Sequence, residues 1–154
     1  MTETTAADLP KVVLSFAPED QEWADRVRVA LVCLGHQERL VCWDPSEIRA
    51  AEDETQEFQK RVEEASLAVL LISPNYLTSE RVKKLDVPTL LARRETAGLP
   101  LIFLQLRPCP WRTVHWIEDT QLFPAGDRSL SGGNTHEIDL DLTKLAYQVN
   151  DLLS

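Results

Sequence analysis

Side chains that could do chemistry gather around one apolar segment and the polar stretch after it. The run Leu67–Ser73 ends at Pro74, which is typical of a strand buried on both faces of a parallel sheet. The helix-prone stretch that follows carries the carboxylate of Asp86 between Leu85 and Val87. Because sites in open α/β sheets lie at the carboxyl ends of the strands, Asp86 is the candidate for a catalytic carboxylate.

Other site types find little support in the residue pattern. His36, His115 and His136 lack the spacing of metal ligands, so we expect no metal site. Three histidines also give no credible Ser-His-Asp or Cys-His arrangement. Gly132-Gly133 follows no predicted strand and opens no predicted helix, which argues against a phosphate-binding loop.

Composition limits the classes of partner. The 154 residues correspond to one domain, and we expect a flexible tail over 1–9 followed by a domain over 10–154. A formal charge of −9 argues against binding to a nucleic-acid backbone. No apolar run approaches the roughly 20 residues of a membrane span, and the N-terminus lacks the features of a secretory signal. An odd count of three cysteines favours reduced thiols and a cytoplasmic location.

Strand and helix patterns alternate from the first strand onward, which predicts a doubly wound parallel α/β sheet with helices on both faces. A fifth strand could lie between Thr120 and Leu130, with Gln121–Phe123 as the best candidate. We expect Pro88 in the first turn of the second of two helical pieces within 75–97. The other predicted elements are strands at Lys11–Phe16, Leu40–Trp43, Leu67–Ser73 and Leu101–Leu106, and helices at about Glu19–Cys33, Asp53–Ala65 and Ile138–Leu153.

Seven short motifs follow one another along the chain: Val-Val-Leu-Ser15-Phe16 with Asp20 and Trp23, Cys-Trp43-Asp44, Ile-Ser73-Pro74-Asn-Tyr76-Leu with Ser79, Leu85-x-Val-Pro88, Leu-Arg107-Pro-Cys109-Pro-Trp111, Leu122-Phe-Pro124 and Gly126-Asp with Leu130. In this order and spacing they resemble the bacterial branch of the Toll/interleukin-1 receptor (TIR) domain family. The resemblance implies a flavodoxin-like sheet of five parallel strands. It also implies one of two activities: cleavage of NAD at the nicotinamide–ribose bond, or assembly with other TIR domains, often in defence against phage.

The same resemblance suggests an NAD cleft. Asp86 matches the family's catalytic glutamate, whose carboxylate would stabilise positive charge on the ribose as nicotinamide leaves. No cofactor is required, because NAD would be the substrate or a ligand. The other residues that the resemblance assigns to the cleft are Ser15, Phe16, Trp43, Ser73 and Tyr76.

Several positions depart from the family pattern. Asp86 is shorter than glutamate by one methylene, about 1.5 Å of reach, and a displacement of about 1 Å can cost on the order of 10²-fold in rate. Ser15-Phe16-Ala17 stands where Ser-Tyr-Ser is usual, and Ala50-Ala51 and Glu54 replace Pro-Gly and an aromatic residue. These changes at one rim favour a cleft released from catalysis.

Structural roles compete with these assignments. Asp86 could simply be an acid in an early helical turn before Pro88, Trp43 a core aromatic, and Ser73 the cap after its strand. The leading hypothesis is therefore a signalling module that assembles with other TIR domains, as a homo-oligomer or with a fused or associated effector or sensor. Its contacts would use Asp44, Ile48 and Arg49. The alternatives are a weak or assembly-activated NAD glycohydrolase, and a receptor that binds an ADP-ribose-like ligand uncleaved.

Overall fold

A four-stranded parallel sheet forms the centre of the molecule. The computed structural model describes residues 9–35, 40–43, 45, 53–117, 122–124 and 128–153. The strands follow the order β2-β1-β3-β4. The chain therefore runs from β1 to β2 at one edge, crosses back over β1 to β3 on its other side, and continues to β4. Their bounds are β1 Lys11–Ser15, β2 Val41–Trp43, β3 Leu67–Ile72 and β4 Leu101–Gln105.

The predicted fifth strand is reduced to a single bridge within the described residues. Phe123 pairs in parallel with Leu104. The Phe123 amide donates to the Phe103 carbonyl at 2.9 Å, and the Gln105 amide donates to the Phe123 carbonyl at 2.6 Å. Phe123 therefore lies where a fifth parallel strand would lie, next to β4. The flavodoxin-like α/β class predicted from the sequence is confirmed.

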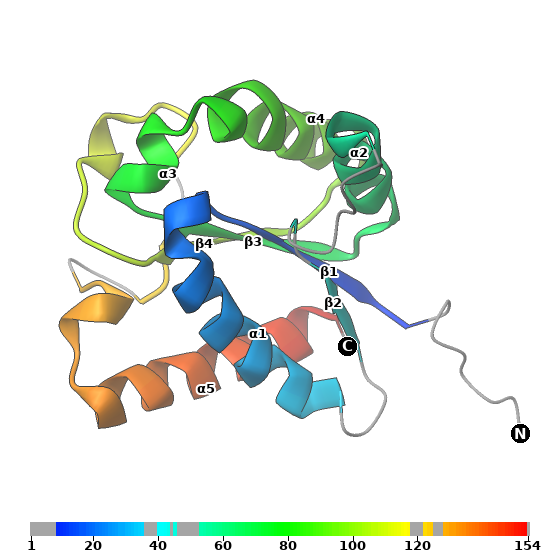
Figure 1. Cartoon of the computed structure of the whole chain (residues 1–154). Helices are drawn as coiled ribbons and strands as arrows, with labels where there is room; N and C mark the ends of the chain where they lie inside the picture. Colours follow the sequence, from blue (N-terminus) through cyan, green and yellow to red (C-terminus); the bar gives the residue numbers. More distant parts are fainter. Residues whose placement is uncertain are drawn as a thin grey trace, which may run out of the picture.

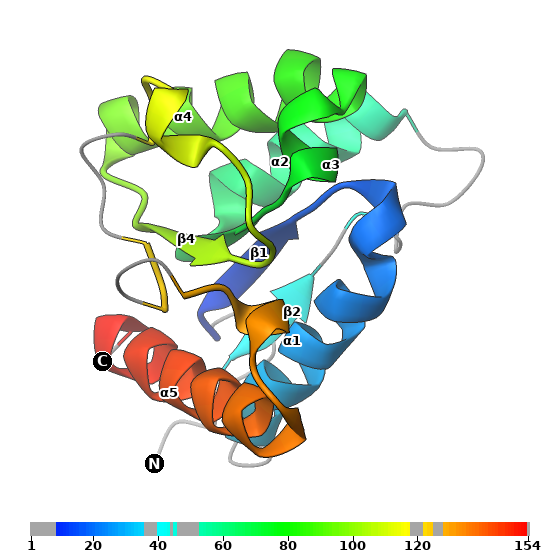
Figure 2. The ribbon, with the colours of Figure 1, turned by 90° about the vertical axis from the view of Figure 1, so that its left-hand side faces the viewer.

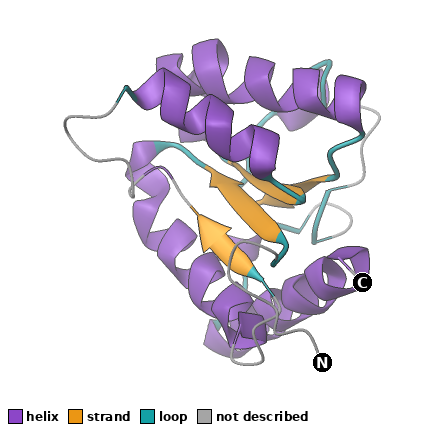
Figure 3. Ribbon diagram, turned by 90° about the vertical axis from the view of Figure 1, so that its right-hand side faces the viewer, coloured by secondary structure: helices purple, strands orange, loops and turns teal. Residues whose placement is uncertain are grey.

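Helices cover both faces of the sheet, as Figures 1 and 2 show. On one face α1 (Gln21–Gly35) packs with α5 (Thr135–Leu153), and on the other lie α2 (Glu54–Glu64), α3 (Pro74–Thr78) and α4 (Val87–Ala97). Each face has its own apolar core, and Figure 3 shows the strands between the two layers of helices. Every residue of β3 is fully buried, which explains its uninterrupted apolar sequence.

Local chemistry fixes the helix ends. The Asp53 side chain accepts a hydrogen bond from the Gln56 amide at the start of α2, and Ser73 accepts one from Tyr76 at the start of α3. Gly98, with φ of 68°, ends α4 in the left-handed region, where a side chain would be strained. The remaining short helical turns are Pro18–Asp20, Trp111–Thr113 and Leu130–Gly132.

The helical stretch before β4 is in two pieces, and Pro88 lies in the first turn of α4, as predicted. Its two pieces separate at Ser79, whose backbone is extended, and the second piece runs without interruption from Glu80 to Ala97. Pro88 lies inside that piece, directly after a π-helical turn over Val82–Asp86. A π turn widens the helix by one residue, which accommodates a proline ring that would otherwise clash with the preceding turn. Asp86 ends that widened turn.

Candidate functional site

Two buried carboxylates, Asp20 and Asp86, lie close to the carboxyl ends of β1 and β3. Ser15 is the last residue of β1, and Ser73 directly follows β3. Each serine hydroxyl donates to one carboxylate: Ser15 to Asp86 at 2.7 Å, and Ser73 to Asp20 at 2.5 Å. The parallel topology thus brings residues that are distant in sequence to one edge of the sheet, as expected for a site in this fold.

The Asp86 carboxylate is sealed from solvent by its neighbours. Its side chain and those of Ser15 and Tyr76 are fully buried. Ser15 Oγ also lies 2.8 Å from the Tyr76 hydroxyl, so one serine joins the phenol to the carboxylate. The Trp116 ring covers Tyr76, with 6.5 Å between the ring centroids. A substrate cannot touch Asp86 while these groups hold this arrangement.

An arginine pairs with the second oxygen of the same carboxylate. Arg81 Nε lies 3.7 Å from Asp86 Oδ1 and 2.8 Å from Glu54 Oε1. Within the described part of the chain, Asp86 Oδ1 forms no hydrogen bond, so the longer ion pair is its polar contact. Arg81 therefore bridges the buried Asp86 to the half-exposed Glu54 in the first turn of α2.

Burial shifts the acidity of this cluster. The pKa of Asp86 rises from 3.8 to about 6, chiefly because burial penalises the charged form; the Ser15 hydrogen bond and the Arg81 charge lower it, and the Glu54 charge raises it further. Burial, and then the Asp86 charge, raise the pKa of the Tyr76 phenol well above its usual 10.0. At neutral pH Asp86 is therefore mostly ionised, and Tyr76 keeps its proton.

The second carboxylate, Asp20, ties the first loop to the loops after β3 and β4. Besides Ser73, it accepts a hydrogen bond from Asn75 Nδ2 at 3.4 Å and pairs with Arg107 Nη1 at 3.6 Å. Asp20 is 1% exposed. It was not among the site residues predicted from the sequence. The available signal was its place in the first motif, five residues after Ser15.

The predicted cleft residues separate into different environments. Ser15, Tyr76 and Asp86 meet directly, and Ser73 belongs to the Asp20 network. Phe16 instead belongs to the core on the α1–α5 face of the sheet. Trp43 is 7% exposed and packs against Phe58, with ring centroids 6.3 Å apart, while the Arg61 guanidinium lies over its ring at 5.5 Å. These positions describe core side chains rather than a ring open to a nucleotide.

The remaining predictions concern assembly residues, metal sites, membrane spans and cysteines. Asp44, Ile48 and Arg49, predicted as assembly residues, lie outside the described residues, as do Ala50 and Ala51. Across the described ranges, no group of three His, Cys, Asp or Glu side chains could hold a metal ion. None of the helices in the described part of the chain is long and apolar enough to cross a membrane. The three cysteines form no disulfide.

Comparison with known proteins decides the family. The profile of the TIR domain family matches residues 12–130. The chain belongs to the TIR domain family. No curated protein sequence matches it.

Solved structures share this TIR fold at low sequence identity. The TIR domain of the Toll-related receptor TRR-2 from Hydra magnipapillata has a TM-score of 0.63 and 14% identity, over 93% of this chain and 98% of that one. The TIR domains of the activated Roq1 resistosome, which recognises the pathogen effector XopQ, give 0.57 and 20%, over 90% and 84%. A prokaryotic SEFIR domain gives 0.53 and 13%, over 94% and 92%.

Proposed function

We propose that this TIR domain is a signalling module that acts by assembling with other TIR domains, in bacterial immune signalling against phage, and that Asp86 serves the fold rather than NAD cleavage. The observation that carries the proposal is the state of Asp86. Its side chain is fully buried, accepts from Ser15 at 2.7 Å and pairs with Arg81.

NAD cleavage would require an exposed Asp86 carboxylate. A carboxylate that stabilises a developing charge on ribose must face the bound sugar, with its oxygens open to the substrate. Here Ser15 occupies one oxygen of Asp86 and the Arg81 guanidinium stands before the other. The side chain is also one methylene shorter than glutamate, so it could not reach past these neighbours without a movement of the helix. These contacts support a positioning role for Asp86.

A second candidate, an NAD glycohydrolase that becomes active on assembly, has one observation in its favour. The groups that close the cluster are only partly buried: the Arg81 side chain is 26% exposed and that of Glu54 is 53% exposed. Withdrawal of Glu54 would release Arg81 and uncover Asp86 without disturbing the Ser15 bond. Even while buried, with a pKa of about 6, Asp86 carries at neutral pH the negative charge that cleavage needs.

Nicotinamide release separates the two candidates. Concentrated protein would be incubated with NAD, alongside Asp86→Ala, Asp86→Glu and the exposed control Asp151→Ala. We expect no release from the wild type or from either alanine variant. Release that disappears in Asp86→Ala and persists in Asp151→Ala would overturn the proposal in favour of the glycohydrolase. NAD cleavage gained only in Asp86→Glu would support the proposal that Asp86 does not catalyse, because the added methylene would then restore a lost contact with the substrate.

Assembly is tested on its own by analytical ultracentrifugation across a concentration series. We expect the wild type to self-associate and Ile48→Asp to abolish association, since a buried charge in a protein contact is costly. Val32→Asp, at an exposed apolar position on α1, is the matched control. A wild type that stays monomeric at all concentrations would count against homotypic assembly, and association that survives Ile48→Asp would exclude the 44–52 segment as its surface.

A further inference from the structure

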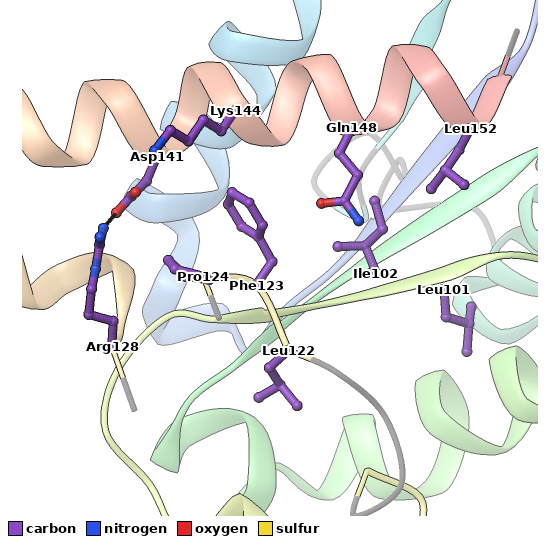
Figure 4. A pocket seen from close by; sticks show the side chains of 10 residues that line it. All are labelled: Leu101, Ile102, Leu122, Phe123, Pro124, Arg128, Asp141, Lys144, Gln148 and Leu152. Atoms are coloured by element: carbon purple, nitrogen blue, oxygen red, sulfur yellow. Dashed lines mark hydrogen bonds and ion pairs between the residues drawn. The ribbon is translucent and has the colours of Figure 1, made fainter. Parts of the chain in front are cut away.

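A cavity of about 470 Å³ lies between the β4 edge and α5, and none of its lining residues belongs to the Asp20 or Asp86 networks. We call it the α5 cavity. Figure 4 shows it extending along α5, with Arg128 and Asp141 at one end and Leu152 at the other. Its volume lies within the range of small-molecule sites, about 300–1,000 Å³.

One end of the α5 cavity carries charge. Asp141 is 3% exposed and accepts a charge-assisted hydrogen bond from the Arg128 guanidinium. Lys144 follows three residues later on α5 and also lines the cavity. Among the described residues, no carboxylate pairs with Lys144. Within the described residues, this end carries the two positive charges of Arg128 and Lys144 and the one negative charge of Asp141, in a chain whose formal charge is −9.

The opposite end is apolar. Leu101 and Leu152 lie at that end, and Ile102 of β4, 5% exposed, lies next to Gln148, while the Phe123 ring lies between Gln148 and Asp141 (Figure 4). Figure 4 shows Gln148 between the two ends, directed from α5 towards Ile102. From Asp141 to Leu152 the helix rises by about 16 Å. The α5 cavity is thus elongated, with a cationic head and an apolar tail.

We propose that the α5 cavity binds an amphiphilic organic anion, specifically a monocarboxylate with a linear apolar tail. Its carboxylate would lie at Lys144 and Arg128, and its tail would run past Gln148 over Ile102 towards Leu152. A single negative charge matches the net positive charge of the described residues at that end. A cationic ligand would meet Lys144 with like charge, and a uniformly polar ligand would leave the Ile102 end without hydrogen bonds. Polar groups placed at one end of a pocket fix the orientation of the ligand in this way.

Decanoate, below its critical micelle concentration, is a suitable probe for the full chain. Isothermal titration calorimetry would compare decanoate with decylamine and 1-decanol, which share the tail and differ in charge. We expect saturable binding of decanoate, weaker binding of decanol and none of decylamine. In NMR spectra the largest amide shifts should fall on 144–152 and 101–102. Absence of decanoate binding, or equal binding of decylamine, would overturn the proposal.

Variants on the exposed face of α5 locate the site without disturbing the core. Lys144→Glu reverses the charge at the head and should weaken decanoate binding at least about tenfold, because charge-assisted contacts are among the stronger ones. Lys60→Glu makes the same change on exposed α2 and should leave binding unchanged. Gln148→Trp would fill the middle of the cavity and abolish binding of both decanoate and decanol. With all three variants shown folded by circular dichroism, undiminished affinity in Lys144→Glu and Gln148→Trp would place the ligand elsewhere.

Discussion

The Ser15 hydroxyl donates to Oδ2 of Asp86 at 2.7 Å and so ties the end of β1 to the π-helical turn 71 positions along the chain. Both groups are fully buried, so neither can exchange this partner for water. Ser15 also contacts the Tyr76 hydroxyl at 2.8 Å. Ser15 therefore holds two elements that follow β3, α3 and the π-helical turn. We expect loss of its hydroxyl to lower the free energy of unfolding, whatever its effect on any activity.

Ser15→Ala should lower the free energy of unfolding by about 1–3 kcal/mol, because it leaves a buried phenol and a buried carboxylate each short of a partner. It should also raise the pKa of Asp86, since the Ser15 bond favours the ionised form. Urea denaturation at pH 7.5 measures the first effect. Tyr76→Phe, which removes one hydroxyl and keeps the Ser15–Asp86 bond, should cost less. Equal decreases in the free energy of unfolding in the two variants would contradict the view that the Ser15–Asp86 hydrogen bond contributes more than the Ser15–Tyr76 contact.

Asp86 should make the fold less stable as the pH rises. Its pKa is raised in the folded state, from 3.8 to about 6, so the native protein holds a proton that the unfolded chain has lost between these values. Stability from this group is therefore full below about pH 4, falls as the pH rises from 4 to 6 and is lost above that, by up to about 3 kcal/mol.

Asp86→Asn isolates that contribution from the other carboxylates. The variant is neutral at every pH, so its stability relative to the wild type should be greater at pH 7.5 than at pH 4. Urea denaturation of both proteins across this range gives the difference directly. A difference that does not change with pH would show that Asp86 titrates near its ordinary pKa.

Arg81 and Glu54 should move the pKa of Asp86 in opposite directions. Arg81→Gln removes a positive charge 3.7 Å from the carboxylate and should raise its pKa above about 6. Glu54→Gln removes a negative charge that acts the other way and should lower it. Carboxyl chemical shifts followed by NMR through a pH titration report both values. Shifts of the same sign would mean that the ion pair is absent in solution.

The features predicted best from the sequence are those that depend on local residue patterns, namely the strands and the sheet topology. The bounds of β1 and β3 follow from uninterrupted apolar runs, and the parallel topology follows from their alternation with helices. The meeting of Ser15, Tyr76 and Asp86 was accessible because residues at the carboxyl ends of neighbouring parallel strands share one edge of the sheet.

The charged partners could not be predicted, because a charge on a helix has the same pattern whether it faces water or a buried carboxylate. Arg81 acquires its role from the start of α2, which is distant in sequence and close in space. The π turn directly before Pro88 was not predicted for a related reason: it leaves no periodic signal in the sequence. Trp43 shows the same limit, since only packing distinguishes a ring on Phe58 from one lining a cleft.

Asp20 should matter more for stability than its ion pair with Arg107 suggests. Asp20→Ala leaves the Ser73 hydroxyl and the Arg107 guanidinium without their carboxylate, next to a strand end, and should cost about 3 kcal/mol. Arg107→Ala should cost at most about 1 kcal/mol, because its side chain is 42% exposed and Asp20 keeps Ser73 and Asn75. Urea denaturation at pH 7.5 ranks the two variants. Equal losses would mean that the charge of Arg107, rather than the hydrogen bonds of the serine and asparagine, holds Asp20 in its buried position.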